Sequence, residues 1–119
     1  DYAYARWAGA PAALIQQRLR LRLAGVLPAG DACRLQVHLQ EFVQTFASTE
    51  RSQGDVRAEL RMLDAQRKVL ATRSVAAMQP AASADARGGV AALADAVDQL
   101  AKEAGGWVRD DARLKSCRQ

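Results

Sequence analysis

The chain has 119 residues, a formal net charge of +4, and 26 alanines against six aromatic side chains. This length leaves room for one hydrophobic core, so we expect a single domain over residues 1–119. A core of small and aliphatic residues argues against an aromatic-lined cavity, and we expect no cofactor. The positive charges are scattered and no aromatic ladder lies on the strands, so we expect no nucleic-acid partner.

The chain opens with a short strand and a helix. Residues 1–7 alternate larger and smaller side chains, as the end of a strand does. Pro11 suits the first turn of a helix and Gly25 suits its stop, which predicts a helix over Ala12–Ala24. We expect its broad apolar face to lie on a sheet. That face consists of Leu14, Ile15, Leu19, Leu21 and Leu23.

Three further strands follow. Arg34–Gln40 alternates apolar and polar residues, and a slip of phase after it predicts either a bulge near Gln40–Glu41 or a twist that redirects the strand end. A loop over Ala47–Gly54 leads to a strand over Asp55–Leu63. A turn over Asp64–Lys68 then leads to a strand over Val69–Met78, so these two strands form an antiparallel hairpin.

A second helix closes the predicted fold. Ser83 or Asp85 can cap it, and it should run over Ala86–Ala104 before Gly105 and Gly106 loosen its last turn. Its apolar stripe consists of Val90, Leu93, Val97, Leu100, Ala104 and Trp107. Residues 109–119 are too polar to pack strongly and are expected to form a tail.

These elements predict an α+β fold in the order β-α-β-β-β-α. The sheet is expected to be mixed but largely antiparallel, to have about four strands, and to carry both helices on one side. Its other face should then meet water or a partner.

The residues that could support catalysis form no known pattern, so we expect no enzyme. His38 is the single histidine and falls on the polar face of a strand, with no nucleophile beside it. The other candidates are more simply explained as solvated charge, helix packing or a weak basic patch. They are Asp95 with Asp98, Asp110 with Asp111, Gly88 with Gly89, and Arg18, Arg20 and Arg22.

Cys33 and Cys117 are the two cysteines of the chain. They do not form a C-x-x-C pair, and His38 alone cannot complete a zinc site with them. In an oxidising compartment they can pair, whereas in a reducing cytosol they stay as separate thiols. The residues by themselves leave both alternatives open.

A series of short segments, none of them specific alone, has an order typical of one family. The segments are Arg6–Trp7, Pro11–Ile15, Leu35–Phe42, the hairpin Val56–Val75 with Asp64 at its turn, Pro80–Asp85, Val90–Leu93 and Trp107–Val108. In this order they resemble the ABC-type transport auxiliary lipoproteins. The resemblance implies a periplasmic protein that works beside an ABC permease and a mammalian-cell-entry subunit in lipid transport, without catalytic residues.

Members of that family carry a lipidated N-terminal cysteine and a further strand ahead of the Trp. The resemblance therefore implies a lipid anchor, which we expect in the outer membrane, and an N-terminal part of the domain that is missing from this chain. A periplasmic address also favours a disulfide between Cys33 and Cys117.

The resemblance and the polar sheet face together predict a docking or assembly component. The alternative is a lipid-binding or small-molecule-binding module that holds its ligand between the helices and the sheet. The predicted partner surface would contact the permease, the mammalian-cell-entry subunit or another copy of this chain. It consists of Gln36, His38, Gln40, Arg57, Glu59 and Arg61.

Overall fold

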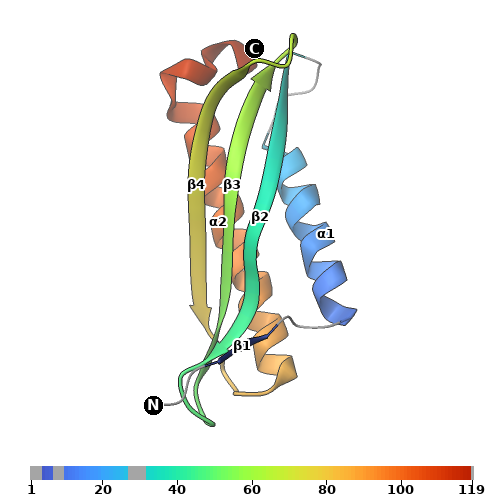
Figure 1. Ribbon diagram of the computed structural model, residues 1–119, viewed down its shortest axis with the longest axis vertical. Coiled ribbons are helices and arrows are strands. Elements are labelled where there is room, and N and C mark those ends of the chain that lie inside the picture. The colour runs from blue at the N-terminus through green and yellow to red at the C-terminus, as the bar shows by residue number, and fades with distance from the viewer. Residues whose placement is uncertain (1–3, 7–9, 27–31, 119) are drawn as a thin grey trace.

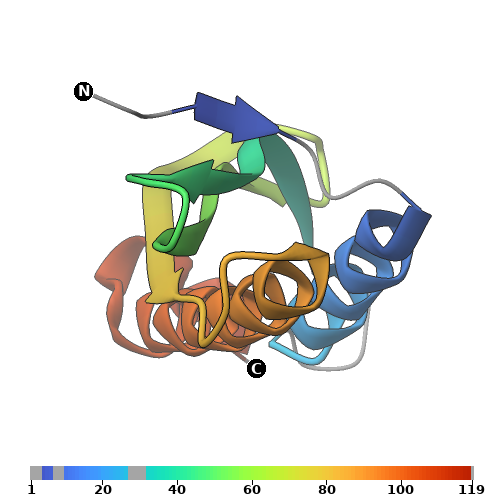
Figure 2. The ribbon, with the colours of Figure 1, turned by 90° about the horizontal axis from the view of Figure 1, so that it is seen from below.

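The computed structural model of the protein describes residues 4–6, 10–26 and 32–118. In chain order its elements are β1 (Tyr4–Arg6), α1 (Ala10–Ala24), β2 (Cys33–Phe46), β3 (Ser52–Asp64), β4 (Val69–Pro80), α2 (Ala86–Asp110) and the 3-10 helix η1 (Ala112–Arg118). Three long strands run side by side along the molecule (Figure 1). Both helices lie on the same face of the sheet (Figure 2), which confirms the predicted α+β class and layering.

The sheet has the order β1-β2-β3-β4, and every pairing between its described strands is antiparallel. The prediction of a mixed sheet was therefore wrong, because the short hairpin connections between the long strands permit only antiparallel neighbours. β1 adds three residues, which pair with residues 44–46 at one end of β2. The predicted four strands are thus three long strands and one short segment, and the element order gains η1 after α2.

β2 is longer than predicted because a bulge carries the strand past Gln40. The pairing register with β3 shifts between Leu39 and Glu41, where the sequence predicts it. An extra residue in one strand reverses the side to which the following side chains point. Phe42 and Phe46 therefore reach the core and are almost completely buried.

The loop between β2 and β3 is shorter than predicted, because β3 begins at Ser52. The predicted loop had included Gly54, which instead lies in the strand beneath α2. A Cβ atom at Gly54 would lie 2.7 Å from the backbone nitrogen of Leu93. This glycine is therefore a packing residue, whose missing side chain lets helix and sheet approach closely.

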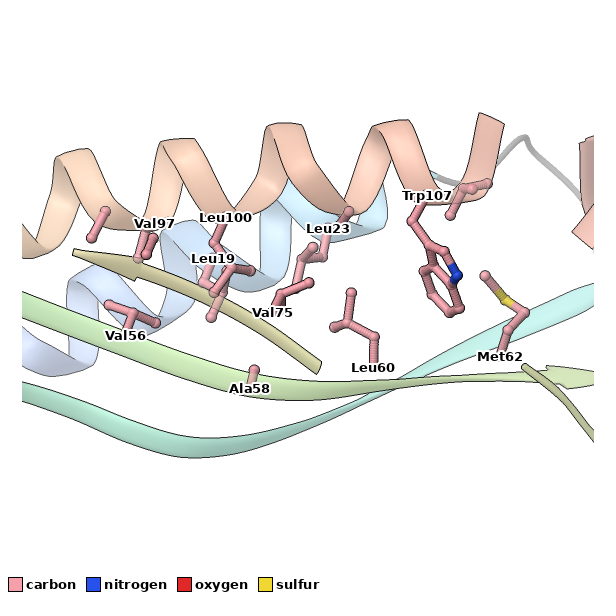
Figure 3. Packing of buried hydrophobic residues seen from close by; sticks show 14 of the residues in the cluster. Leu19, Leu23, Val56, Ala58, Leu60, Met62, Val75, Val97, Leu100 and Trp107 are labelled. Carbon is pink, nitrogen blue, oxygen red and sulfur yellow. The ribbon is translucent and has the colours of Figure 1, made fainter. Parts of the chain in front are cut away.

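α2 supplies much of the core, as its apolar stripe predicts. Leu93, Val97, Leu100 and Ala104 are fully buried, and Trp107 is almost so. Figure 3 shows Val97, Leu100 and Trp107 directed at the side chains of the sheet, and α2 contacts β3, β4 and α1. The space between α2 and the sheet is therefore filled, which is unfavourable to a ligand chamber there.

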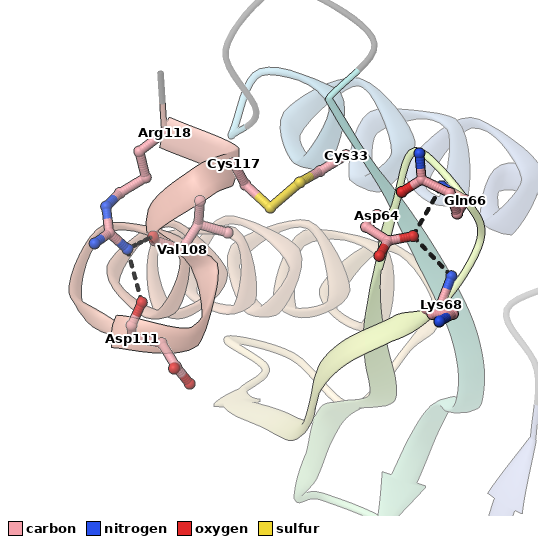
Figure 4. Close-up of a disulfide and its surroundings, with 8 residues drawn as sticks. All are labelled: Cys33, Asp64, Gln66, Lys68, Val108, Asp111, Cys117 and Arg118. Atoms are coloured by element: carbon pink, nitrogen blue, oxygen red, sulfur yellow. Dashed lines mark hydrogen bonds between the residues drawn. A yellow bond between two sulfur atoms is a disulfide. The ribbon is translucent and has the colours of Figure 1, made fainter.

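The C-terminal residues do not form the predicted polar tail. α2 continues through Gly105 and Gly106 to Asp110, and η1 follows. Leu114 is fully buried and Cys117 is 3% exposed, because residues three apart in a 3-10 helix share one side. The Arg118 guanidinium donates to the backbone carbonyls of Val108 and Asp111 at 2.8 and 2.7 Å (Figure 4). Because of these contacts, the segment packs against the rest of the protein in spite of its polar composition.

α1 packs against α2, and only one of its sides is buried. Ile15, Leu19 and Leu23 belong to the core, as predicted. Leu14 and Leu21 are 72% and 68% exposed, so assigning them to the same buried face was wrong. α1 contacts the rest of the protein along one narrow strip. Ile15, Leu19 and Leu23, which are spaced four residues apart, are enough to fill it.

Candidate docking surface

The six residues predicted as a partner surface lie on β2 and β3. The register pairs Gln36 with Arg61 and His38 with Glu59, and it pairs Glu41 with Arg57 beyond the bulge. The residues that alternate with Arg57, Glu59 and Arg61 along β3 are buried in the core, so these three side chains and their partners on β2 point away from the helices. We call this group, Gln36, His38, Gln40, Arg57, Glu59 and Arg61, the outer sheet face.

The outer sheet face is hollowed at the edge of β2. Gln36, His38, Gln40, Glu59 and Arg61 line an open depression of about 570 Å³, together with Val37. Val37 is 38% exposed although it belongs to the inward row of β2. Gln40 has no partner in the register because it lies at the bulge, yet it joins the other predicted residues around this depression.

Two ion pairs order the charges of the outer sheet face. Arg61 Nη2 lies 3.1 Å from Glu59 Oε1, and Arg57 Nη2 lies 3.7 Å from Glu41 Oε2. Both arginine side chains remain about half exposed, at 47% and 55%. A guanidinium has five N–H donors, so each arginine keeps donors that can bind a carboxylate of another molecule.

β4 extends this surface with small side chains. Thr72, Ser74 and Ala76 pair with Arg61, Glu59 and Arg57, and all three are exposed. The sequence-based prediction missed them, although the alternation of the predicted strand over Val69–Met78 could have placed them beside the arginines. Small residues next to long charged ones leave the arginine stems accessible from the side of β4.

A disulfide joins Cys33 and Cys117, with their Cα atoms 5.5 Å apart (Figure 4). It links the first residue of β2 to η1, and therefore one end of the sheet to the segment that follows α2. The adjoining turn is ordered by Asp64, whose Oδ1 accepts hydrogen bonds from the backbone nitrogens of Gln66 and Lys68 at 2.8 and 2.9 Å. The disulfide and this turn therefore stabilise the end of the sheet at which β2 begins.

Two of the acidic residues considered for catalysis, Asp98 and Asp111, have structural partners. Asp98 accepts two hydrogen bonds from Arg18 at 3.0 and 2.8 Å, and these bonds hold the pKa of Asp98 below its usual range. Asp111 binds Arg113 and the Trp107 indole, and its pKa is likewise lowered, chiefly by Arg113. Carboxylates held in the charged form by such contacts serve as anchors for helices.

Gly88 and Gly89 also have packing roles. Asp85 caps α2 by accepting a hydrogen bond from the Gly88 backbone nitrogen at 2.8 Å. The Gln44 side chain, only 2% exposed, donates to the Asp85 carbonyl at 2.9 Å and to Ser52 Oγ at 3.1 Å. A Cβ at Gly89 would collide with this amide. No pattern in the amino-acid sequence indicates this buried contact between β2 and the start of α2.

Within the described part of the chain, no group of three or more His, Cys, Asp or Glu side chains could hold a metal ion. Over the same residues, neither α1 nor α2 combines the length and apolar character needed to cross a bilayer. The described residues therefore offer three features for a functional site. They are the outer sheet face, the sheet end held by the disulfide, and the partly exposed helix α1.

Residues 2–105 match the family model described as the ABC-type transport auxiliary lipoprotein component. The chain belongs to this family. The family name associates the transport auxiliary lipoproteins with ABC transport systems, and the segment order that suggested the resemblance is confirmed by the extent of this match.

Solved structures that share the fold of this chain include proteins of Xanthomonas campestris and Caulobacter crescentus. A Xanthomonas campestris protein is 22% identical with a TM-score of 0.59, and the match covers 65% of this chain and 46% of that one. A Caulobacter crescentus protein, described as a lipoprotein, is 17% identical with a TM-score of 0.53 and coverage of 87% and 86%. The chain thus spans less than half of the Xanthomonas chain. No curated protein matches it in sequence.

Proposed function

We propose that this chain is a noncatalytic docking component of an ABC-type lipid transport system. In this proposal the outer sheet face binds an ABC permease or mammalian-cell-entry subunit of that system. Membership of the transport auxiliary lipoprotein family supports the association with a transporter. We further propose that the protein lies in the periplasm and is anchored to the outer membrane by a lipid on an N-terminal cysteine. The disulfide is consistent with an oxidising compartment.

One observation carries the choice of surface. The helices occupy one side of the sheet, while the polar row on the other side is not covered by any described element (Figure 2). An antiparallel sheet often exposes one face to water, so exposure alone is weak support. The half-exposed arginines add to it, because arginine is enriched at protein interfaces and its fork pairs well with carboxylates.

The test reverses the charge of this face and follows binding to the transporter. Arg57→Glu with Arg61→Glu should leave the fold intact, since exposed substitutions usually change stability by less than about 0.5 kcal/mol. The variant should nevertheless lose co-purification with the permease or mammalian-cell-entry subunit of the transport system. It should also fail to restore the envelope barrier in a deletion strain.

The matched control is Arg51→Glu with Arg87→Glu, which makes the same charge change at exposed residues outside the outer sheet face. If both double variants fold, localise and complement like the unmodified protein, the outer sheet face is only a solvated surface. Native mass spectrometry of the purified protein addresses the alternative function, because a bound acyl chain would favour a lipid-binding module.

A further inference from the structure

α1 exposes an apolar surface that no described element covers. Leu14 and Leu21 are separated by two helical turns and so lie on one side of the helix, at 72% and 68% exposure. We call the exposed residues around them, Leu14, Gln17, Arg18, Arg20 and Leu21, the outer α1 face. Single exposed leucines are ordinary on soluble proteins, whereas neighbouring ones form a patch that calls for an explanation.

The patch continues onto α2. Leu14, Ile15 and Leu21 line an open groove whose other apolar wall is formed by Val90 and Ala94 of α2. This groove runs along the seam between the helices, on the side of the helix layer that faces away from the sheet interior. The exposed leucines are therefore part of a longer apolar surface.

The charged residues around this patch are three arginines of α1 and two aspartates of α2, Asp95 and Asp98, so the cations exceed the anions by one. α1 contains Arg18, Arg20 and Arg22 and no acidic residue. Arg18 and Arg22 lie 2.8 and 3.2 Å from Asp98 of α2, but their side chains stay 46% and 51% exposed. These ion pairs hold α1 against α2, while Arg20 adds an exposed cation on the other flank of the leucines.

Leucines between arginines, on a helix without carboxylates, fit the interface of a membrane with negative headgroups. Such a helix lies flat, places its apolar side chains among the upper acyl carbons, and directs its cations to the phosphates. The family is one of lipoproteins, so a bilayer is within reach of its members.

We propose that the outer α1 face binds the surface of an anionic phospholipid bilayer. This inference goes beyond the docking function and does not depend on it. The helices lie on one side of the sheet and the outer sheet face lies on the other (Figure 2). A molecule resting on α1 therefore leaves the outer sheet face directed away from the membrane, and both surfaces can be occupied at once.

The direct test is sedimentation of the purified chain with lipid vesicles at low salt. The chain should bind vesicles of about equal parts phosphatidylglycerol and phosphatidylcholine, and bind pure phosphatidylcholine much more weakly. Leu14→Ala with Leu21→Ala should lower the partition coefficient about tenfold or more. Arg20→Gln should lower it about fivefold, and added salt should weaken binding further.

Two matched controls lie elsewhere on the molecule. Val69→Ala with Met78→Ala removes apolar area from residues that are 51% and 55% exposed on β4. Arg109→Gln removes an exposed cation near the end of α2. Both should bind vesicles like the unmodified chain. The docking variant Arg57→Glu with Arg61→Glu should also bind them normally, which separates failure of this inference from failure of the docking function.

A second measurement does not depend on loss of binding. In Leu14→Trp, the fluorescence emission should shift to the blue when phosphatidylglycerol vesicles are added, whereas in Met78→Trp it should not. The inference is overturned if the chain ignores anionic vesicles, if it binds neutral ones equally well, or if the leucine variant binds like the unmodified chain. Absence of vesicle binding would leave a protein partner as the occupant of the patch.

Discussion

The two helices carry leucines at the same spacing, with opposite outcomes. Leu93 and Leu100 of α2 are fully buried, whereas Leu14 and Leu21 of α1, also seven residues apart, are largely exposed. α2 packs against β3, β4 and α1, whereas α1 is held chiefly by α2. Apolar periodicity therefore identifies residues that share a side of a helix, but the number of neighbours decides whether that side is buried.

Removing the disulfide tests how much this bond, which joins η1 after α2 to the start of β2, stabilises the fold. Cys33→Ser with Cys117→Ser should lower the free energy of unfolding by about 4 to 5 kcal/mol, because the bond closes a long loop in the unfolded chain. Urea unfolding followed by circular dichroism measures this change. If thiol titration of periplasmically made protein, denatured without reductant, finds two free thiols, the bond is not formed.

Truncating one leucine in each helix tests the comparison itself. Leu100→Ala should lower the free energy of unfolding by about 2 to 5 kcal/mol, since it leaves a cavity in the core. Leu21→Ala should change it by less than about 0.5 kcal/mol, since the side chain already meets solvent. Leu93→Ala provides a second buried site. Losses below about 1 kcal/mol at both Leu93 and Leu100 would mean that the α2 stripe is not the core.

The smallest expected effect concerns the ion pairs between the helices. Because Arg18 lowers the pKa of Asp98 in the folded protein, the charged carboxylate stabilises the fold above its ordinary pKa of about 4. This contribution is lost as the pH falls through the lowered pKa. Asp98→Asn should therefore unfold slightly more easily than the unmodified protein at neutral pH.

The two proteins should converge as the pH falls below about 4. Urea unfolding at a series of pH values measures the difference, and Asp95→Asn serves as a control on the same helix. A difference between Asp98→Asn and the unmodified protein that stays constant down to strongly acidic pH would show that the carboxylate charge is not what holds α1.

Local patterns were enough to predict the strands and α2. The alternation of Arg34–Gln40 and the phase slip after it located both the strand and its bulge, because side-chain period and strand geometry are directly linked. The outer sheet face followed from the same alternation. Its residues could be grouped from the sequence because pairing in antiparallel hairpins brings predictable rows together.

The errors arose where tertiary contacts decide the outcome. Gly54 lies in a segment whose composition is typical of a turn. It nevertheless occupies a strand, because the backbone of α2 packs where a side chain would be. Leu114 and Cys117 lie in a polar segment, yet they pack because η1 presents both on one side. Leu14 and Leu21 were assigned to the core because no local signal says how wide the contact with α2 will be. The exposed patch on α1 could not be found for the same reason.

The position of the Cys33–Cys117 bond also sets an order of events during biosynthesis. Synthesis proceeds from the N-terminus, so the bond can form only after Cys117, and therefore every element from β2 to α2, has been synthesised. The resulting covalent ring encloses β2, β3, β4, α2 and most of η1, whereas β1 and α1 lie outside it. The disulfide therefore does not restrain β1 and α1, which join the ring through the chain that leads to Cys33.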